Sequence, residues 1–231
     1  MRLLTKTTLP VSPAGRGGCR DAHFLSYATE WLDAQPSWRP DGQALVISAR
    51  GSESDRADVH LLLLDPALRL EARRVLTDTP GLDELTPVFA PSGDAIVFER
   101  TGVIYQQPLP DGEAKRLTSG FRLCHAPRFL ASGRLLVSWE ENKRYGLDVM
   151  DPDGGNRETL REGTVDYRRV SPSPDGRFLA ATFALDLGFG PGALLRPWAT
   201  EEVHLLDHRG NRITTLVGTW RHSNHSADWG R

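Results

Sequence analysis

Histidine and arginine are the residues of this sequence whose types and spacing could support chemistry. Imidazole nitrogens are common ligands of divalent metal ions, and we expect His125, His222 and His225 to lie near one another in the fold. Arg168 and Arg169 are adjacent, and a guanidinium can bind a carboxylate through two hydrogen bonds. Together these groups would suit a divalent metal and an acidic substrate. We favour the plainer interpretation that the histidines are polar residues on a loop rim and that no cofactor is bound.

The motifs of several large enzyme classes are missing from the sequence. It has no Gly-x-Ser-x-Gly elbow, no Walker-type phosphate loop and no dinucleotide fingerprint. Glu140 and Glu141 are adjacent, so in a strand they would face opposite sides and make a poor acid–base pair. Asp151 and Asp153 lack the later ligands of a calcium loop, and we expect a β-turn there. We therefore nominate no catalytic residue and favour a role other than catalysis.

A segment rich in glycine and proline, residues 186–199, is a second candidate binding element. Its composition predicts a loop. Phe189, Leu195, Arg196 and Trp198 give it apolar bulk and a cation, and aromatic residues with arginine are typical anchors of protein interfaces. Two outcomes stay open: the loop folds back on its scaffold, or it binds a partner as loops on rigid scaffolds often do.

The elements that must position these residues are short β-strands. Helical periodicity is nearly absent, whereas short runs of β-forming residues recur between clusters of Gly, Pro and Asp. The chain has 22 glycines and 16 prolines to supply the intervening turns. The predicted strands include residues 44–48, 59–64, 95–98, 135–139, 178–183 and 203–206. We expect His60 and His204 to lie on strand surfaces.

One phrase recurs five times along the chain. Its fullest copy, residues 36–42, reads Pro-Ser-Trp-Arg-Pro-Asp-Gly, in which Pro, Asp and Gly favour a tight turn. The third position is usually aromatic and should anchor each unit on its neighbour, although Pro172 replaces it in the fourth copy. The copies begin at residues 36, 87, 127, 170 and 227, and such intervals are typical of β-propeller blades, which repeat every ~40–50 residues.

A second turn recurs inside each unit. These turns are Asp65-Pro66, Asp111-Gly112, Asp153-Gly154 and Arg209-Gly210. Each unit then consists of four strands, which is one blade. We predict an all-β protein: a β-propeller of about four to five four-stranded blades over residues 36–231. Two outcomes stay open for the last blade: it is incomplete, or its last strand is supplied from elsewhere. Residues 1–35 form an N-terminal segment that could supply closure strands.

The strand before each phrase should be the innermost strand of its blade, beside a central channel. The residue two places before each phrase is then equivalent around the ring. This equivalence places His125, Arg168 and His225 beside the same channel, with His222 close to His225. It is the reason for treating the three histidines as one group.

The repeat resembles the WD-like repeat of the TolB family. The resemblance is carried by residues 36–42, by Asp151-Pro152-Asp153-Gly154 and by Lys115-Arg116-Leu117-Thr118, and it covers residues 36–231. It is more specific for fold than for function, because one propeller fold serves many roles. In that family the propeller is a periplasmic interaction platform. Similar propellers gate prolyl oligopeptidases and tricorn-type proteases, and another forms oligogalacturonate lyase, whose channel histidines hold a divalent metal.

Three functions follow as hypotheses. The first is a non-catalytic module that binds a protein or peptide through the 186–199 loop or the channel rim at Arg168 and Arg169. The second is a metal-dependent polysaccharide lyase resembling oligogalacturonate lyase, with the three grouped histidines as ligands. The third is the propeller part of a prolyl-oligopeptidase-like protease. A small-molecule ligand is left open.

Composition narrows the choice of partner and compartment. A net charge of −2 argues against a general nucleic-acid binder, which needs a basic face. No apolar run approaches the length of a membrane span, and the N-terminus lacks the apolar core of a signal peptide. We expect a soluble cytoplasmic protein, or a periplasmic one if a signal peptide has been removed. Cys19 and Cys124 are too few for a disulfide framework.

Overall fold

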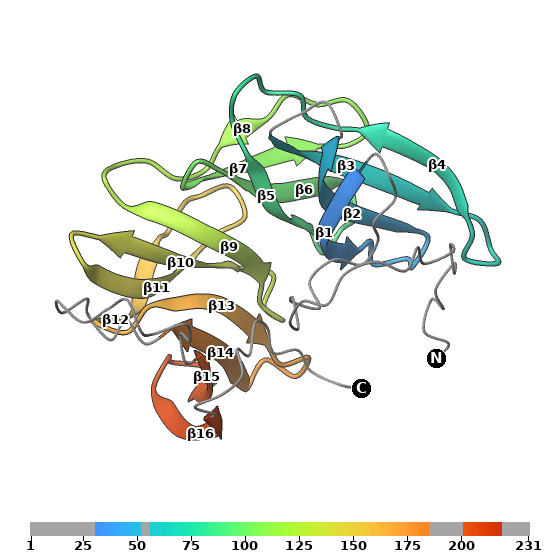
Figure 1. The fold of residues 1–231 in the computed structure, drawn as a ribbon. Helices are drawn as coiled ribbons and strands as arrows, with labels where there is room; N and C mark the ends of the chain where they lie inside the picture. Colours follow the sequence, from blue (N-terminus) through green and yellow to red (C-terminus); the bar gives the residue numbers. More distant parts are fainter. Residues whose placement is uncertain (1–30, 52–55, 185–200, 219–231) are drawn as a thin grey trace, which may run out of the picture.

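The computed structural model describes residues 31–51, 56–184 and 201–218, and the regular elements in these ranges are β-strands. Sixteen strands form four antiparallel sheets, in each of which the strand order follows the chain (Figure 1). The first two sheets are β1 (Trp31–Trp38), β2 (Ala44–Gly51), β3 (Ala57–Leu64), β4 (Leu70–Val75) and β5 (Glu84–Phe89), β6 (Ala95–Arg100), β7 (Val103–Pro108), β8 (Lys115–Arg116). The last two are β9 (Leu123–Phe129), β10 (Leu135–Glu141), β11 (Arg144–Met150), β12 (Glu158–Gly163) and β13 (Tyr167–Pro172), β14 (Phe178–Ala184), β15 (Glu201–Asp207), β16 (Arg212–Gly218).

The four sheets are arranged as the blades of a four-bladed β-propeller, here numbered 1 to 4 in chain order. The first strand of each later blade packs across the blade before it: β5 contacts β1 to β3, β9 contacts β5 to β7, and β13 contacts β9 to β11. Within the described ranges, the last strands β4, β8, β12 and β16 contact no strand of a neighbouring blade. Figure 1 shows β1, β5, β9 and β13 toward the middle and the last strands at the periphery. The strand that precedes each phrase is therefore the innermost one, as predicted.

The repeated phrase forms the tight turn between the first and second strands of every blade. In each of the four described copies the glycine N–H donates to the carbonyl oxygen three residues earlier at 2.9 Å. In blade 1, Gly42 has a φ of 72°, a conformation that residues with a side chain rarely adopt. Asp41 Oδ1 accepts the Gln43 N–H at 2.9 Å and closes the same turn. The turn predicted from the sequence is confirmed.

The second turn joins the third and fourth strands and also touches the blade before it. Gly154 lies between β11 and β12 with a φ of 89°, and a Cβ there would lie 2.6 Å from the carbonyl oxygen of Leu117 in blade 2. Both the conformation and the close approach require glycine. In the next blade, the carbonyl oxygen of Gly210 accepts a hydrogen bond at 2.8 Å from Arg161 of blade 3. In blades 3 and 4 the second turn therefore contacts the preceding blade.

Apolar side chains fill the space between consecutive blades. Successive strand residues face opposite sides, so Ile96 and Phe98 of β6 pack toward blade 1 while Val97 packs toward blade 3. The clusters are Ala44, Val46, Val59, Leu61, Phe89, Ile96 and Phe98 between blades 1 and 2; Val88, Val97, Ile104, Cys124, Leu135, Val137, Trp139 and Met150 between blades 2 and 3; and Leu136, Leu147, Val149, Tyr167, Val170, Leu179, Ala181 and Leu206 between blades 3 and 4. Because both faces of these strands are covered, their sequences contain continuous apolar runs.

The Leu-Thr pair that follows the fourth strand of blades 1 and 2 has a structural role. Thr77 Oγ1 accepts the Val59 N–H at 2.8 Å, and Thr118 Oγ1 accepts the Ile104 N–H at 3.0 Å. Leu76, just before Thr77, packs against the cluster between blades 1 and 2. Each pair thus satisfies a buried backbone donor of the third strand and contributes to the core.

Some side chains do not lie where the sequence analysis expects them. The aromatic of each phrase packs toward the preceding blade, so Phe89 is buried on blade 1; no blade precedes Trp38 in the described ranges, and it is 48% exposed. His60 and His204 are buried, not on strand surfaces, because the third strands are covered on both faces. His204 contacts the Tyr167 hydroxyl at 3.2 Å, and burial lowers the pKa of this histidine.

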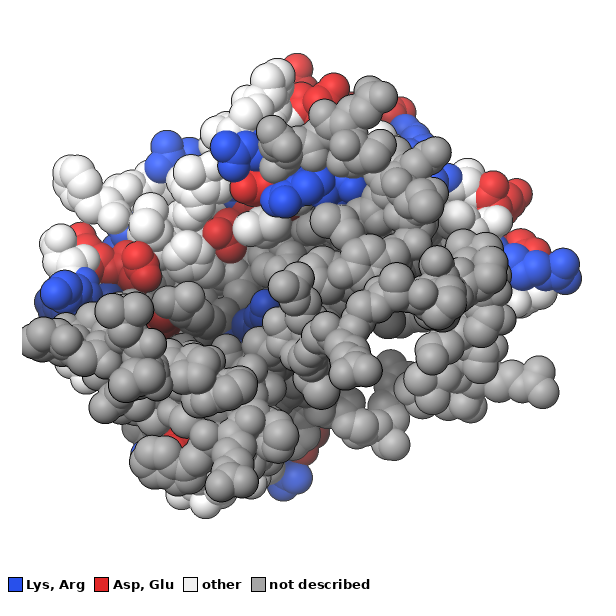
Figure 2. All heavy atoms as spheres, viewed as in Figure 1, with Lys and Arg blue, Asp and Glu red and all other residues white. Residues whose placement is uncertain are grey.

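The described surface carries both signs of charge. Figure 2 shows Lys and Arg side by side with Asp and Glu on the described part of the visible face, without a broad region of one sign. In the parts of the chain that the structure describes, no helix has the length and apolar character needed to cross a bilayer.

Candidate functional site

The innermost strands share a backbone bulge one residue before the phrase. Gln35, Thr86 and Ala126 hold this position in blades 1 to 3, with φ values of 55°, 51° and 47°. The strand register is irregular at the same places. A positive φ is uncommon outside glycine and is a marked outlier for a β-branched residue such as Thr86. Bulges redirect side chains, so they decide which groups face the middle of the propeller.

Side chains of the preceding blade bind the amides that these bulges release from strand pairing. Gln35 Oε1 accepts the Thr86 N–H at 2.7 Å and the Ser48 hydroxyl at 3.3 Å. One blade further on, Glu99 Oε2 accepts the Ala126 N–H at 3.4 Å. These inner polar residues therefore tie blade 1 to blade 2 and blade 2 to blade 3, and part of their role is structural.

His125 lies on β9, the innermost strand of blade 3. Its Nδ1 is 2.9 Å from Glu99 Oε1, and its side chain is 36% exposed. The hydrogen bond to Glu99 raises the pKa of His125, with smaller contributions from Glu140 and Asp166, while burial opposes the rise. His125 and Glu99 therefore form an ion pair over a wider pH range than an isolated histidine would allow. Because Nδ1 is occupied, a metal or ligand would have to use Nε2.

The remaining candidate residues are placed only in part. Arg168 and Arg169 lie on β13, whose partner across the blade boundary is β9, the strand of His125. Phe189, Leu195, Arg196, Trp198, His222 and His225 lie outside the described residues. Among the residues that are described, no three His, Cys, Asp or Glu side chains are arranged to hold a metal ion. The three-histidine metal site stays a prediction.

A pocket of about 520 Å³ lies where the first turns of blades 2, 3 and 4 meet, and we call it the turn-end pocket. Its lining residues are Phe89, Pro91, Phe129, Leu130, Ala131, Ser132, Gly133, Pro172, Ser173 and Pro174. None of them is charged, and the polar side chains are two serines. Its size falls within the range of small-molecule pockets, about 300–1,000 Å³.

The sequence analysis missed this pocket, although its signal was present. Phe89, Phe129 and Pro172 occupy the same third position of the phrase in blades 2, 3 and 4. The turns of blades 1 and 2 also touch, because a Cβ at Gly93 would lie 3.4 Å from Arg39 Cγ. Trp38, the exposed third-position residue of blade 1, therefore lies at the same end of the propeller.

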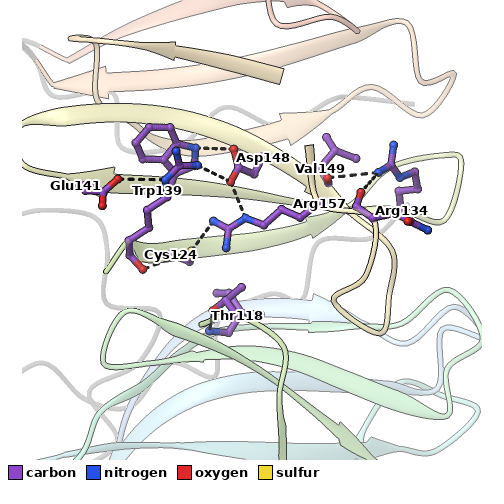
Figure 3. Close-up of polar contacts among 11 residues, drawn as sticks. Thr118, Cys124, Arg134, Trp139, Glu141, Asp148, Val149 and Arg157 are labelled. Atoms are coloured by element: carbon purple, nitrogen blue, oxygen red, sulfur yellow. Dashed lines mark hydrogen bonds and ion pairs between the residues drawn. The ribbon is translucent and has the colours of Figure 1, made fainter. Parts of the chain in front are cut away.

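A buried carboxylate organises blade 3 (Figure 3). Asp148 accepts the Trp139 Nε1–H at 2.7 Å and pairs with Arg157 at 2.6 Å and Arg122 at 3.2 Å. The Arg122 guanidinium also lies 3.9 Å from the centre of the Trp139 ring. Cys124 lies beside Arg157, with 3.3 Å between Sγ and Nη2, and burial raises the pKa of its thiol. A raised thiol pKa is the opposite of what a nucleophilic cysteine needs, so this network is structural.

Comparison with known proteins bears on the fold. No protein-family model matches the chain, and no curated protein matches it in sequence. A solved structure of a putative TolB from Agrobacterium tumefaciens superposes with a TM-score of 0.67 at 19% identity, covering 84% of this chain and 67% of that one. The chain is structurally similar to TolB-like β-propellers.

Two enzyme structures contain a similar propeller. A puromycin hydrolase matches with a TM-score of 0.59 at 18% identity, covering 81% of this chain and 29% of that chain. An oligogalacturonate lyase in complex with manganese matches with a TM-score of 0.56 at 13% identity, covering 80% and 53%. The present chain thus spans about half or less of either enzyme, and the likeness is one of fold.

Proposed function

We propose that this protein is a non-catalytic β-propeller that binds a protein or peptide in the turn-end pocket. The observation that carries the proposal is that three blades converge on one uncharged pocket through the same position of their repeats. Apolar walls favour an apolar side chain of the partner, since burial gains ~25 cal/mol for each Å² of apolar surface. Trp38, exposed at the same end, is the kind of residue that anchors interfaces.

The backbone around the pocket supports rigid recognition. The turns of blades 3 and 4 are each closed by a 2.9 Å hydrogen bond, from Gly133 to Leu130 and from Gly176 to Ser173. Phe89 and Phe129 are also packed against the interblade clusters. A pocket whose walls are already ordered loses little conformational entropy when a peptide binds.

The experiment introduces a charge into the pocket without disturbing the core. A peptide selected from a displayed random library is titrated against the wild-type protein, Ser132→Glu and Ser92→Glu by calorimetry. Ser132 lines the pocket, whereas Ser92 holds the same exposed turn position in blade 2 outside it. We expect Ser132→Glu to weaken binding at least tenfold, which is about 1.4 kcal/mol, and Ser92→Glu to change it less than twofold. Equal affinity of all three proteins would contradict the proposal.

Contacts outside the pocket are proposed as secondary. The 186–199 loop, with Phe189, Leu195, Arg196 and Trp198, has the composition of an interface loop. Arg168 and Arg169 on β13 could add a carboxylate contact at the inner rim. Replacing Trp198 with Ala should weaken capture of the selected peptide, and unchanged capture would remove the loop from the binding surface.

A second candidate function rests on the pairing of His125 with Glu99. In a metal site, Glu99 would orient the ring so that Nε2 faces the ion, with His222 and His225 as further ligands. The likeness to the manganese-bound lyase supports a metal-dependent polysaccharide lyase. Elemental analysis after growth with manganese, iron and zinc tests it, and a substoichiometric metal content would exclude it.

The puromycin hydrolase likeness favours a third candidate, the propeller of a prolyl-oligopeptidase-like protease. Reading the gene on both sides of this sequence for a serine hydrolase domain tests that candidate.

A further inference from the structure

We propose that the turn-end pocket binds a proline-rich segment of its partner in the polyproline II conformation. The proposal rests on the function proposed above and adds the chemical class of the ligand. Three features of the pocket carry it: the rings in its walls, the pairing of the charges around it, and the hydrogen-bond donors that its turns already use.

Rings make up much of the pocket wall. Five of the ten lining residues carry one, namely Phe89, Pro91, Phe129, Pro172 and Pro174. Phe129 and Pro172 are half-buried and Pro91 and Pro174 are exposed, so ring surface remains accessible to a ligand. Grooves lined by aromatic side chains are docking sites for proline-rich segments in several domain families.

The charged residues of the four first turns are engaged within their own blades. Three arginines of these turns each pair with a carboxylate of the same blade. The pairs are Arg39–Asp41 at 2.9 Å, Arg134–Asp151 at 3.4 Å and Arg177–Asp175 at 2.6 Å. The remaining charged residue of these turns, Asp94, accepts the Ser92 hydroxyl. A pocket with uncharged walls and paired charges around it favours a ligand segment that is itself uncharged.

Hydrogen-bond donors of the pocket walls are bonded within the turns. The Leu130 N–H donates to the Arg134 carbonyl oxygen at 2.8 Å, and the Ser173 N–H donates to the Phe178 carbonyl oxygen at 2.9 Å. The Ser173 hydroxyl donates to Asp175 at 2.7 Å and accepts the Phe178 N–H at 2.9 Å. The three lining prolines have no N–H. The walls therefore suit a ligand whose carbonyl groups stay in water.

A polyproline II segment meets this requirement. It has no internal hydrogen bonds and its backbone is fully solvated, so its carbonyl groups can face water while its rings contact the pocket. Its proline residues also have no N–H that would need an acceptor in the wall. Because the conformation exists before binding, ordering the segment costs little. A ligand that binds as an added β-strand would need a sheet edge, whereas turns form this pocket.

The test is an NMR titration that observes the amide signals of Gly133 and Ser173, both of which line the pocket. The probes are three capped peptides of equal length: acetyl-hexaproline-amide, acetyl-Ala-Gln-Ala-Ala-Gln-Ala-amide and acetyl-Leu-Gln-Gln-Leu-Gln-Gln-amide. We expect hexaproline to shift both signals and to bind at least tenfold more tightly than either other peptide. The signal of Gly163, in the outer strand β12, should not move.

Ser132→Glu places a carboxylate among the rings, and hexaproline should bind this variant at least tenfold more weakly than wild type. Ser92→Glu, the matched turn position outside the pocket, should bind within twofold of wild type. Ser132 is exposed, so Ser132→Glu should fold, and unchanged amide signals of the outer strands check this.

Three results would each overturn the proposal: no shift with hexaproline at millimolar concentration, equal binding of the alanine or leucine peptide, or full affinity of hexaproline for Ser132→Glu. The library-selected peptide tests the pocket itself. If that peptide loses affinity in Ser132→Glu while hexaproline does not bind wild type, the pocket remains a peptide site and only its preference for proline is wrong. If neither peptide responds to Ser132→Glu, the proposed function is wrong as well.

Discussion

Two buried carboxylates of this molecule, Asp148 and Glu84, differ in their hydrogen bonding. Asp148 binds three donors, from Trp139, Arg122 and Arg157. Glu84 binds Thr79 and Arg100 through one oxygen, and its other oxygen has no hydrogen-bond partner among the described residues. A buried charge is tolerated when it is paired and hydrogen-bonded, so the hydrogen bonds and ion pairs of Asp148 stabilise the fold.

We expect Asp148→Asn to destabilise the protein by about 3 kcal/mol, because it leaves Arg122 and Arg157 without their shared partner. Urea unfolding followed by tryptophan fluorescence measures the change. Glu162→Gln is the control: it breaks an ion pair with the exposed Arg144 in the same blade, and such pairs contribute less than about 1 kcal/mol. Similar losses in both variants would show that Asp148 does not organise the blade.

The pairing of His125 with Glu99 predicts a pH-dependent contribution to stability. Because the pKa of His125 is raised in the folded state, the contribution is complete below the ordinary histidine pKa of ~6.5 and is lost as pH rises through the folded value. The free energy of unfolding of wild type should exceed that of His125→Gln by up to about 1 kcal/mol at pH 6, and by less at pH 9. A difference that stays constant with pH would contradict the pairing.

The two recurring turns have different structural roles. The first turn closes a hairpin and supplies the walls of the turn-end pocket. The second turn touches the preceding blade, as the approach of Gly154 to Leu117 shows. A turn that only reverses the chain tolerates many residues, whereas one that also packs on a neighbour does not.

Gly154→Ala should therefore destabilise the protein by about 2–4 kcal/mol, from the positive φ and the overlap with Leu117 together. Gly163→Ala is the matched control, because that glycine lies in β12 with open space around a new Cβ. It should change the free energy of unfolding by less than about 1 kcal/mol. Urea unfolding measures the free energy of unfolding of both variants. A loss for Gly154→Ala no larger than that for Gly163→Ala would mean that the second turn is not a contact between blades.

Across the whole molecule, each blade is coupled to its immediate neighbours. The described contacts run from blade 1 to 2, from 2 to 3 and from 3 to 4, and each boundary has its own apolar cluster. Stability in such arrays is approximately a sum of unit and nearest-neighbour terms.

Phe98→Ala should thus loosen one boundary more than the others. Phe98 is fully buried between blades 1 and 2, and its truncation should cost about 3–5 kcal/mol. Hydrogen exchange by mass spectrometry should show faster exchange in residues 44–63 and 95–107 than in residues 178–184. An equal increase in all of these segments would mean that the blades open together.

Local patterns made much of the fold predictable. The strands over residues 44–48, 95–98 and 135–139 and both recurring turns were predicted correctly, because hydrophobic runs and turn residues act over a few neighbours. The innermost position of β9, and with it of His125, followed from the repeat. The repeat did not predict the partner of His125, because Glu99 lies 26 residues earlier in another blade.

The order of residues alone established a succession of four-stranded units, because turn geometry depends on adjacent residues. The packing of those units then determined which side chains are buried and which residues of different blades lie close together. Trp38 has the same place in its phrase as Phe89, yet it is exposed because no described blade precedes it. Ala57 and Asp83 belong to different blades, and the hydrogen bond from the Ala57 N–H to Asp83 Oδ1 brings the starts of β3 and β5 together. Burial and the approach of charges depend on neighbours distant in the chain, and these exist only once the blades have packed.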